Sequence, residues 1–180
     1  MRHRVFIAIN LPEEIKKELS SFQSKWPELP CRWTKKENLH ITLEFLGYLT
    51  DEELIELCQK TKEMASGKKT FSIRLNKICY GPPRKSPRHP DESRGGWRGG
   101  WSPRMVWVIG ERVKEFNLTP HITLGRIKTW EFRQIEPEER PIVEEEISLN
   151  FEVNSIEVME SQLKRGGTEY TILASCPLKS

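Results

Sequence analysis

Two copies of the tetrapeptide His-Ile-Thr-Leu begin at His40 and His121, and they supply the side chains best suited to chemistry. Each copy lies in a β-rich run and is followed closely by glycine. Residues i and i+2 share a face in a strand, so His40 and Thr42 point the same way, as do His121 and Thr123. Each strand would therefore present one imidazole and one hydroxyl on a single surface.

Two such strands facing each other across a cleft would suit a phosphodiester substrate. One neutral histidine can remove a proton from water while the other, protonated, donates to the leaving oxygen. The ordinary pKa of histidine lies near neutrality, which makes this mixed protonation state accessible. The threonine hydroxyls can bind the non-bridging phosphate oxygens. This chemistry needs no metal ion.

A structural explanation of the repeat stays open on these residues alone. A single His-x-Thr on a strand is a weak signal, and threonine is common in strands. Two identical tetrapeptides could also be chance, or the structural echo of a duplication.

The elements that must carry these residues are mostly strands. Asn10 and Pro12 predict the start of one helix, which ends near Pro27, and the capping-box pattern from Thr50 to Glu53 predicts a second. Short apolar or alternating runs predict strands at 5–9, 32–34, 39–46 (ended by Gly47), 71–75, 105–109, 122–127, 147–153, 156–159 and 170–174. Many strands and few helices predict an α+β fold with antiparallel sheet.

Composition bounds the protein without identifying it. The chain has 180 residues, 36% hydrophobic and 31% charged, with a formal net charge of only +3. We expect one domain spanning 1–180. The four cysteines are scattered, without metal-ligand spacing, and no signal peptide or apolar run of membrane-spanning length is present. These features favour a cytoplasmic protein that is not membrane-bound.

Residues 81–104 form a long loop rich in proline, glycine and arginine. Within it, 94–101 alternates arginine, paired glycines and tryptophan, a composition that can follow a single RNA strand. The competing interpretation is a disordered insertion with ordinary surface charge. This interpretation is slightly favoured over specific RNA binding, although weak RNA affinity is expected. The acidic segment 136–146 is interpreted as a solvated connection, and the run at 144–146 is not interpreted as a metal site.

Other histidines and tryptophans receive structural interpretations. His3 and His89 have no motif context and are expected at the surface. Trp33 and Trp107 are expected to pack in the core.

The surroundings of both tetrapeptides point to a known family. The segments concerned are Phe6–Pro12, Arg32–Thr34, Glu37–Gly47, Thr119–Arg126 and, at the end, Phe151–Val153 through Glu160-Ser161 to Tyr170-Thr171. In these segments the chain resembles the 2H phosphoesterase superfamily, most closely the bacterial and archaeal RNA 2′,3′-cyclic phosphodiesterases. That family was long called the 2′-5′ RNA ligases, of LigT or ThpR type. The resemblance covers nearly the whole chain.

This resemblance implies a bilobal α+β fold with pseudo-two-fold symmetry. Antiparallel sheets would line a V-shaped cleft, with the helices outside. The family's first-motif histidine is the proton donor and its second-motif histidine the acceptor, which by position are His40 and His121. The other implied contacts are Thr42, Thr123 and Arg126 to phosphate, and Phe45 beside the base.

The implied activity is hydrolysis of RNA 2′,3′-cyclic phosphate ends to 2′-phosphates, without metal or cofactor, and RNA 2′-5′ ligation is also attributed to the family. The expected partner is an RNA or oligonucleotide with such an end, bound by a monomer. Two alternatives remain: a 2H phosphodiesterase for another cyclic nucleotide or a 2′-5′ oligonucleotide, and a catalytically impaired RNA-binding module.

One departure from the family concerns the second lobe. A helix usually precedes the second motif, but only 110–118 intervene here, too few for a helix and its connections. We therefore expect a trimmed second lobe, or one completed by the 81–104 loop. His40 has full motif surroundings, whereas His121 lacks the usual helical support.

Overall fold

The computed structural model describes residues 1–82 and 103–179, so nearly all of the arginine-rich loop lies outside the described residues. The described chain contains nine strands and three α-helices. The strands are β1 (His3–Asn10), β2 (Cys31–Trp33), β3 (His40–Leu49), β4 (Phe71–Gly81), β5 (Met105–Gly110), β6 (His121–Ile127), β7 (Glu144–Val153), β8 (Ser155–Lys164) and β9 (Gly167–Pro177). The helices are α1 (Glu13–Phe22), α2 (Asp51–Ser66) and α3 (Thr129–Gln134).

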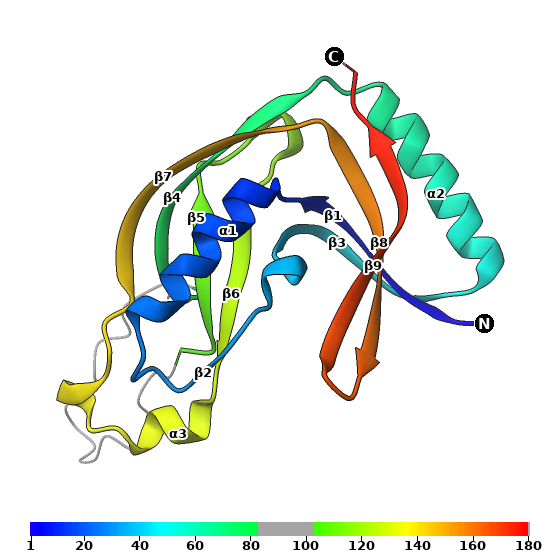
Figure 1. Cartoon of the computed structure of the whole chain (residues 1–180). Coiled ribbons are helices and arrows are strands. Elements are labelled where there is room, and N and C mark those ends of the chain that lie inside the picture. Colours follow the sequence, from blue (N-terminus) through cyan, green and yellow to red (C-terminus); the bar gives the residue numbers. More distant parts are fainter. Residues whose placement is uncertain (83–102, 180) are drawn as a thin grey trace, which may run out of the picture.

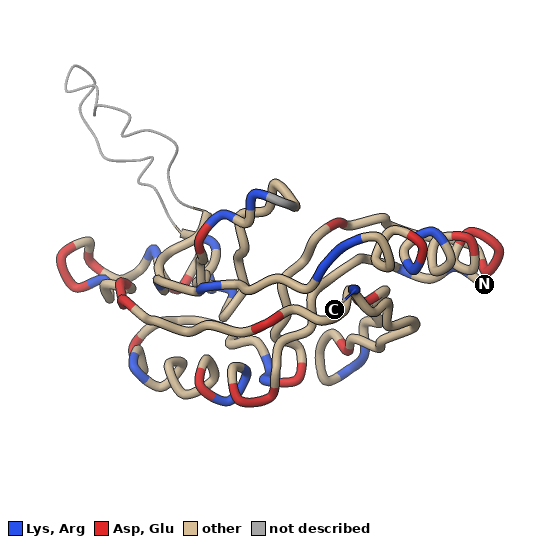
Figure 2. The backbone as a smooth tube through the Cα atoms, turned by 90° about the horizontal axis from the view of Figure 1, so that it is seen from above, with Lys and Arg blue, Asp and Glu red and all other residues tan. Residues whose placement is uncertain are grey.

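The strands form one sheet in the order β7-β4-β5-β6-β3-β1-β8-β9, and β2 adds to β6. The pairings between these strands are antiparallel, which confirms the predicted α+β class. Counted outward from β3 and β6 along this order, each half of the sheet has four strands, and β2 is a fifth in the half that holds β6. The two halves together form an arch (Figure 1) and lie side by side along the long axis when seen from above (Figure 2). The strands that carry the tetrapeptides are thus the innermost pair.

Each half of the sheet is covered by one helix (Figure 1). Helix α2 packs on β8 and β9, and α1 lies across β4, β5 and β6. The connection from Gly110 to Pro120 holds only a short 3-10 turn, Lys114–Phe116, as its length predicts. Even so, the second half is not left bare, because Leu19 of α1 and Leu124 of β6 are fully buried in the same core. The helix before the second motif is therefore absent, as predicted, but α1 packs in the same core as the His121 strand.

Several local predictions need correction. Helix α1 is capped by Pro12 without a side-chain bond, and Asn10 instead ends β1 opposite His40. The capping box of Thr50 and Glu53 is confirmed. Gly47 does not end its strand, since β3 passes through it with a φ of 82° and continues to Leu49.

The start of β7 and the side chain of His3 make contacts that the sequence does not predict. Strand β7 begins at Glu144, within the supposed solvated connection, because its first residues pair with the end of β4. Lys77 and Lys25 also form ion pairs with Glu144 and Glu145. His3 is not a free surface residue either. Its ring forms hydrogen bonds with the carboxylates of Asp51, at 2.8 Å, and Glu160, at 2.7 Å, and these two hydrogen bonds raise the pKa of His3.

A close approach of β2 to β6 makes Gly125 hard to replace. A Cβ added there would lie 2.8 Å from the Trp33 ring and would also overlap the Cys31 sulfur. Gly125→Ala is therefore expected to destabilise the protein by about 1–3 kcal/mol, measured by urea unfolding. Gly166→Ala is the matched control, since a Cβ at Gly166 meets nothing within 4 Å. Equal midpoints for Gly125→Ala and wild type would contradict the close packing.

Candidate active site

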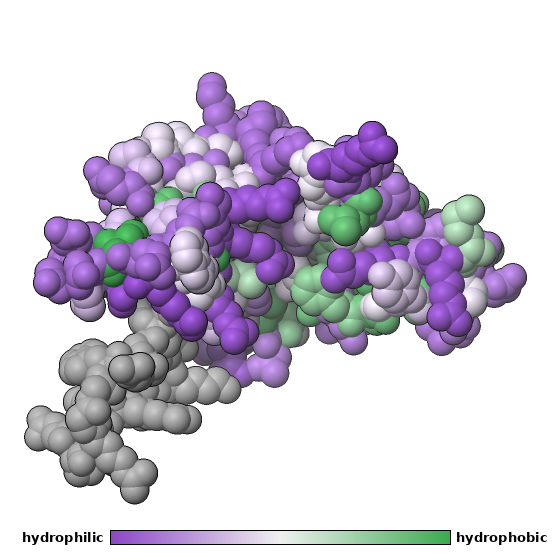
Figure 3. Space-filling model, turned by 90° about the horizontal axis from the view of Figure 1, so that it is seen from below, coloured by the Kyte–Doolittle hydropathy of each residue, from purple (hydrophilic) through white to green (hydrophobic). Residues whose placement is uncertain are grey.

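The two tetrapeptides meet at the centre of the sheet. Ile41 of β3 pairs directly with Ile122 of β6, and both side chains are fully buried. One residue to either side, antiparallel geometry sets the histidine of each motif opposite the threonine of the other. The four polar side chains therefore share the sheet face opposite the two isoleucines. Seen from below, the molecule is hollowed between its two halves, with apolar side chains among polar ones (Figure 3).

The His40 ring is held on all sides. Its Nδ1 lies 2.7 Å from the carbonyl oxygen of Asn38, and its Nε2 lies 3.0 Å from the hydroxyl of Thr42. A carbonyl can only accept, so Nδ1 carries the proton, and in the neutral ring Nε2 accepts from Thr42. The rings of Phe6 and Tyr170 pack against it at centroid distances of 5.1 and 5.0 Å. This tautomer leaves Nε2 as the atom available for proton transfer.

The surroundings of His40 favour its neutral form. Burial, which penalises the charged ring, lowers the pKa of His40 most. The hydrogen bond to the Asn38 carbonyl acts in the opposite direction, while the charges of Lys16 and His121 lower this pKa further. A bound phosphate anion would reverse the balance, because a nearby negative charge favours the protonated ring.

His121 is held differently. Its Nδ1 lies 3.5 Å from the carbonyl of Thr119, at the limit of a hydrogen bond. Its ring instead packs against the indole of Trp107, with centroids 4.5 Å apart and planes at 36°. Trp107 pairs with Thr123 across β5 and β6, so it lies on the histidine face, and its assignment to the core is wrong. The Trp107 Nε1 is buried without a hydrogen-bond partner among the described residues.

Matching bulges in β3 and β6 bring two further candidate site residues, Phe45 and Arg126, onto the face of the histidines. Thr42 and Phe45 pair with Ala8 and Phe6, two residues apart on β1, so the leucine of the first tetrapeptide is an extra, bulged residue. Phe45 thus shares the face of His40, lies 5.8 Å from the Phe6 ring and is 71% exposed.

The second tetrapeptide contains a bulge at the same position. Thr123 and Arg126 pair with Trp107 and Met105, two residues apart on β5, so Leu124 is the extra residue. Arg126 thereby lies on the Thr123 face, and the Thr123 hydroxyl approaches the Met105 sulfur at 3.8 Å. Each motif histidine is therefore followed, five residues on, by an exposed side chain on the same face.

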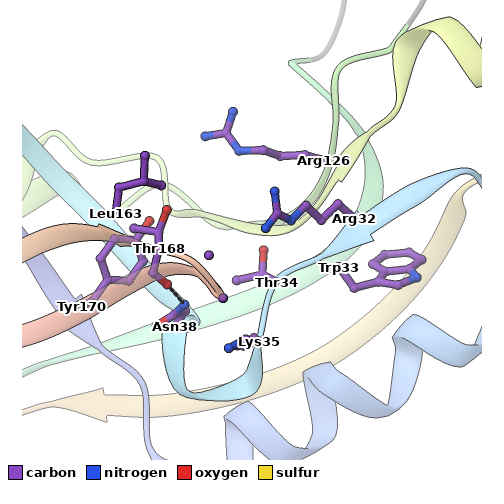
Figure 4. Close-up of a pocket in the computed structure, with 11 residues that line it drawn as sticks. Arg32, Trp33, Thr34, Lys35, Asn38, Arg126, Leu163, Thr168 and Tyr170 are labelled. Carbon is purple, nitrogen blue, oxygen red and sulfur yellow. Dashed lines mark hydrogen bonds between the residues drawn. The ribbon is translucent and has the colours of Figure 1, made fainter.

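A pocket of about 210 Å³ adjoins this site, between β2, β6 and the tip of the β8–β9 hairpin. Figure 4 shows Arg32 and Arg126 extending from one side toward Leu163, Thr168 and Tyr170 of the hairpin. Lys35, Asn38 and Thr34 also line it, whereas the Trp33 ring points away and packs on Trp26. The sequence gives no role to Arg32, Lys35 or Thr168. Arg32 and Tyr170 lie in the segments that resemble the family, and this position is the signal by which the sequence could have identified them as site residues.

No group of three or more histidine, cysteine or carboxylate side chains is placed to hold a metal ion within residues 1–82 and 103–179. Over the same ranges, no helix has the length and apolar character needed to cross a membrane.

Comparison with known proteins agrees with this geometry. The family described as LigT like Phosphoesterase matches residues 9–90. An RNA 2′,3′-cyclic phosphodiesterase of Methanocaldococcus jannaschii is 31% identical over 134 residues, covering 69% of this chain and 72% of that protein. One of Thermotoga maritima is 28% identical over 189 residues, covering 96% and 94%.

Solved structures share the fold. A protein of Thermus thermophilus superposes with a TM-score of 0.75 at 24% identity, covering 97% of both chains. E. coli LigT complexed with 3′-AMP gives a TM-score of 0.73 at 22% identity over the whole of both chains. The bilobal 2H phosphoesterase fold is thereby confirmed, and the chain belongs to the LigT-like phosphoesterase family.

Proposed function

We propose that this protein hydrolyses the 2′,3′-cyclic phosphate end of RNA to a 2′-phosphate by two-histidine acid–base catalysis. The pairing of Ile41 with Ile122 carries the proposal, because it sets two imidazoles and two hydroxyls on one face around a common centre. The relatives named above are RNA 2′,3′-cyclic phosphodiesterases, which supports the same substrate.

In the proposed reaction, the cyclic phosphate lies between the two motifs. His121 takes a proton from water as the water oxygen bonds to phosphorus, and His40 donates a proton as the bond from phosphorus to the 3′ oxygen breaks. The products are a 2′-phosphate and a 3′-hydroxyl. Thr42 and Thr123 donate hydrogen bonds to the non-bridging oxygens, whose negative charge grows in the transition state.

Arg126 and Phe45 complete the proposed site. Arg126 is exposed on the Thr123 face and would place a guanidinium near the phosphate, where it can donate two parallel hydrogen bonds. Phe45 is exposed beside Phe6 on the His40 face, and its ring offers a surface on which a base can stack.

The donor role of His40 requires a change of protonation on binding. Burial holds its pKa down in the free protein, so substrate phosphate must raise it before His40 can act as an acid. The bond from its Nδ1 to Asn38 fixes the ring so that Nε2 presents the proton.

A defined oligonucleotide tests the activity. An RNA ending in a 2′,3′-cyclic phosphate should be converted to the 2′-phosphate, identified against 2′- and 3′-phosphate standards, at an unchanged rate in the presence of a metal chelator. A 3′-phosphate product, or activity lost to the chelator, would refute the mechanism. Selective cleavage of a 2′-5′ oligonucleotide in the same panel would refute the substrate.

Trp107 gives a prediction that separates positioning from binding. Because His121 is held more by the indole than by its 3.5 Å bond, Trp107→Leu should lower kcat up to about tenfold with little change in KM. Trp107→Phe keeps a smaller aromatic ring and removes an N–H that has no partner among the described residues, so it should retain most of kcat. Equal losses in both variants, at equal thermal stability, would argue against ring packing as the cause.

We further infer that one chain suffices and that it works in a reducing, cytoplasmic environment. Both histidine motifs come from the same chain, and the four cysteines are unpaired.

A further inference from the structure

The pocket beside the histidine site has a strongly cationic wall. Arg32 and Arg126 stand directly opposite each other on β2 and β6, and Lys35 lines the same space. Within the described residues, no carboxylate pairs with any of the three at ion-pair distance. Three neighbouring cations without a counter-charge repel one another, so an anion that enters the pocket is favoured.

The pocket is held in shape before anything binds. The Asn38 side-chain amide donates to the Thr168 carbonyl at 2.8 Å, which ties the hairpin to the segment before β3. The Thr34 hydroxyl donates to the Thr123 carbonyl at 2.8 Å, which ties β2 to the second motif strand. The Arg32 guanidinium lies close to Gly167, where an added Cβ would be 3.3 Å from it. The backbone walls of the pocket are therefore in place before binding, which favours affinity, and binding orders only the exposed side chains of Arg32, Lys35 and Arg126.

The pocket shares its residues with the proposed catalytic site. Tyr170 lines it and packs on the His40 ring, and Asn38 lines it while its carbonyl binds His40. Arg126 belongs to the second motif strand. A nucleotide whose cyclic phosphate lies at the histidines would thus have a neighbouring group beside Arg32.

We propose that this pocket binds the phosphate on the 5′ side of the terminal nucleotide, with Arg32 as its principal ligand. In RNA that phosphate is the last backbone phosphodiester. The inference rests on the proposed function. It means that the protein recognises a terminal nucleotide by two phosphates, one on the 2′,3′ side and one on the 5′ side of the ribose. A mononucleoside cyclic phosphate with a free 5′-hydroxyl would leave Arg32 and Lys35 without an anionic partner.

Binding tests the pocket independently of turnover. We expect adenosine 2′,5′-bisphosphate to bind at least about tenfold more tightly than adenosine 2′-monophosphate by calorimetry, the typical value of one charge-assisted hydrogen bond. Arg32→Gln should remove this preference, and Arg32→Lys should restore part of it. Arg133→Gln, which removes the same charge from exposed α3, should keep it. Equal affinities in wild type, or a preference that survives Arg32→Gln, would overturn the assignment.

Turnover then distinguishes the source of the phosphate. Adenosine 2′,3′-cyclic phosphate is compared with its 5′-phosphorylated form and with a dinucleotide ending in the same cyclic phosphate. We expect kcat/KM to rise for both phosphate-bearing substrates, and Arg32→Gln to cancel the increase. An increase confined to the mononucleotide would overturn backbone recognition. If nothing is hydrolysed while the binding preference holds, the proposed function fails and the anion pocket stands.

Discussion

Replacing either cleft histidine with alanine should lower kcat/KM for an RNA ending in a 2′,3′-cyclic phosphate by on the order of 10²–10⁴-fold, the usual contribution of one acid or base group. His40 and His121 lie on one sheet face around the Ile41–Ile122 pair and would act on a single phosphate. The double variant should therefore lose much less than the product of the two single losses, because each residue needs the other. Initial rates of all three variants provide the measurement.

His3→Ala is the matched control for these variants. His3 binds Asp51 and Glu160 away from the cleft, so its removal should leave kcat/KM unchanged at temperatures where the variant is folded. Circular dichroism melting would establish the folded range of every variant. Activity retained in either His40→Ala or His121→Ala would exclude the two-histidine mechanism.

The division of roles gives the second large effect. A cyclic substrate with sulfur in place of the bridging 3′ oxygen has a leaving group that needs no proton. His40→Ala should therefore recover most of its loss, on the order of 10²-fold or more, on this substrate. His121→Ala should recover nothing, since water must still be deprotonated. Rescue of His121→Ala instead would reverse the two roles.

The pH dependence of the wild type should agree with that assignment. The pKa of His40 is lowered from its ordinary value of 6.5, mainly by burial. As the pH rises, His40 in the free enzyme therefore loses its proton before the pH reaches 6.5. As an acid, His40 should make kcat/KM fall with rising pH, starting below 6.5. The profile of kcat should fall at higher pH, because bound phosphate raises the same pKa. Identical limbs in the two profiles would contradict the proposed effect of substrate.

The sequence by itself determined the repeated motif, the class of fold and the type of chemistry. These follow from local rules: alternation in a strand puts His40 beside Thr42, and a capping box starts α2 at Asp51. The family resemblance added the pairing of the two motifs. Period-two alternation alone, however, would put Phe45 and Arg126 on the faces opposite their histidines.

Only the tertiary structure decided the features that depend on contacts between distant segments. The bulges at Leu43 and Leu124 appear in the register with β1 and β5, and they turn Phe45 and Arg126 onto the active face. Helix α1, which follows β1 of the other half, covers the β4–β6 side, because an apolar sheet face can be covered by a helix from a distant segment. The cationic pocket arises where β2, β6 and the β8–β9 hairpin meet, which no spacing in the sequence reveals. Local periodicity fixed which residues could act, and long-range strand register fixed which of them meet.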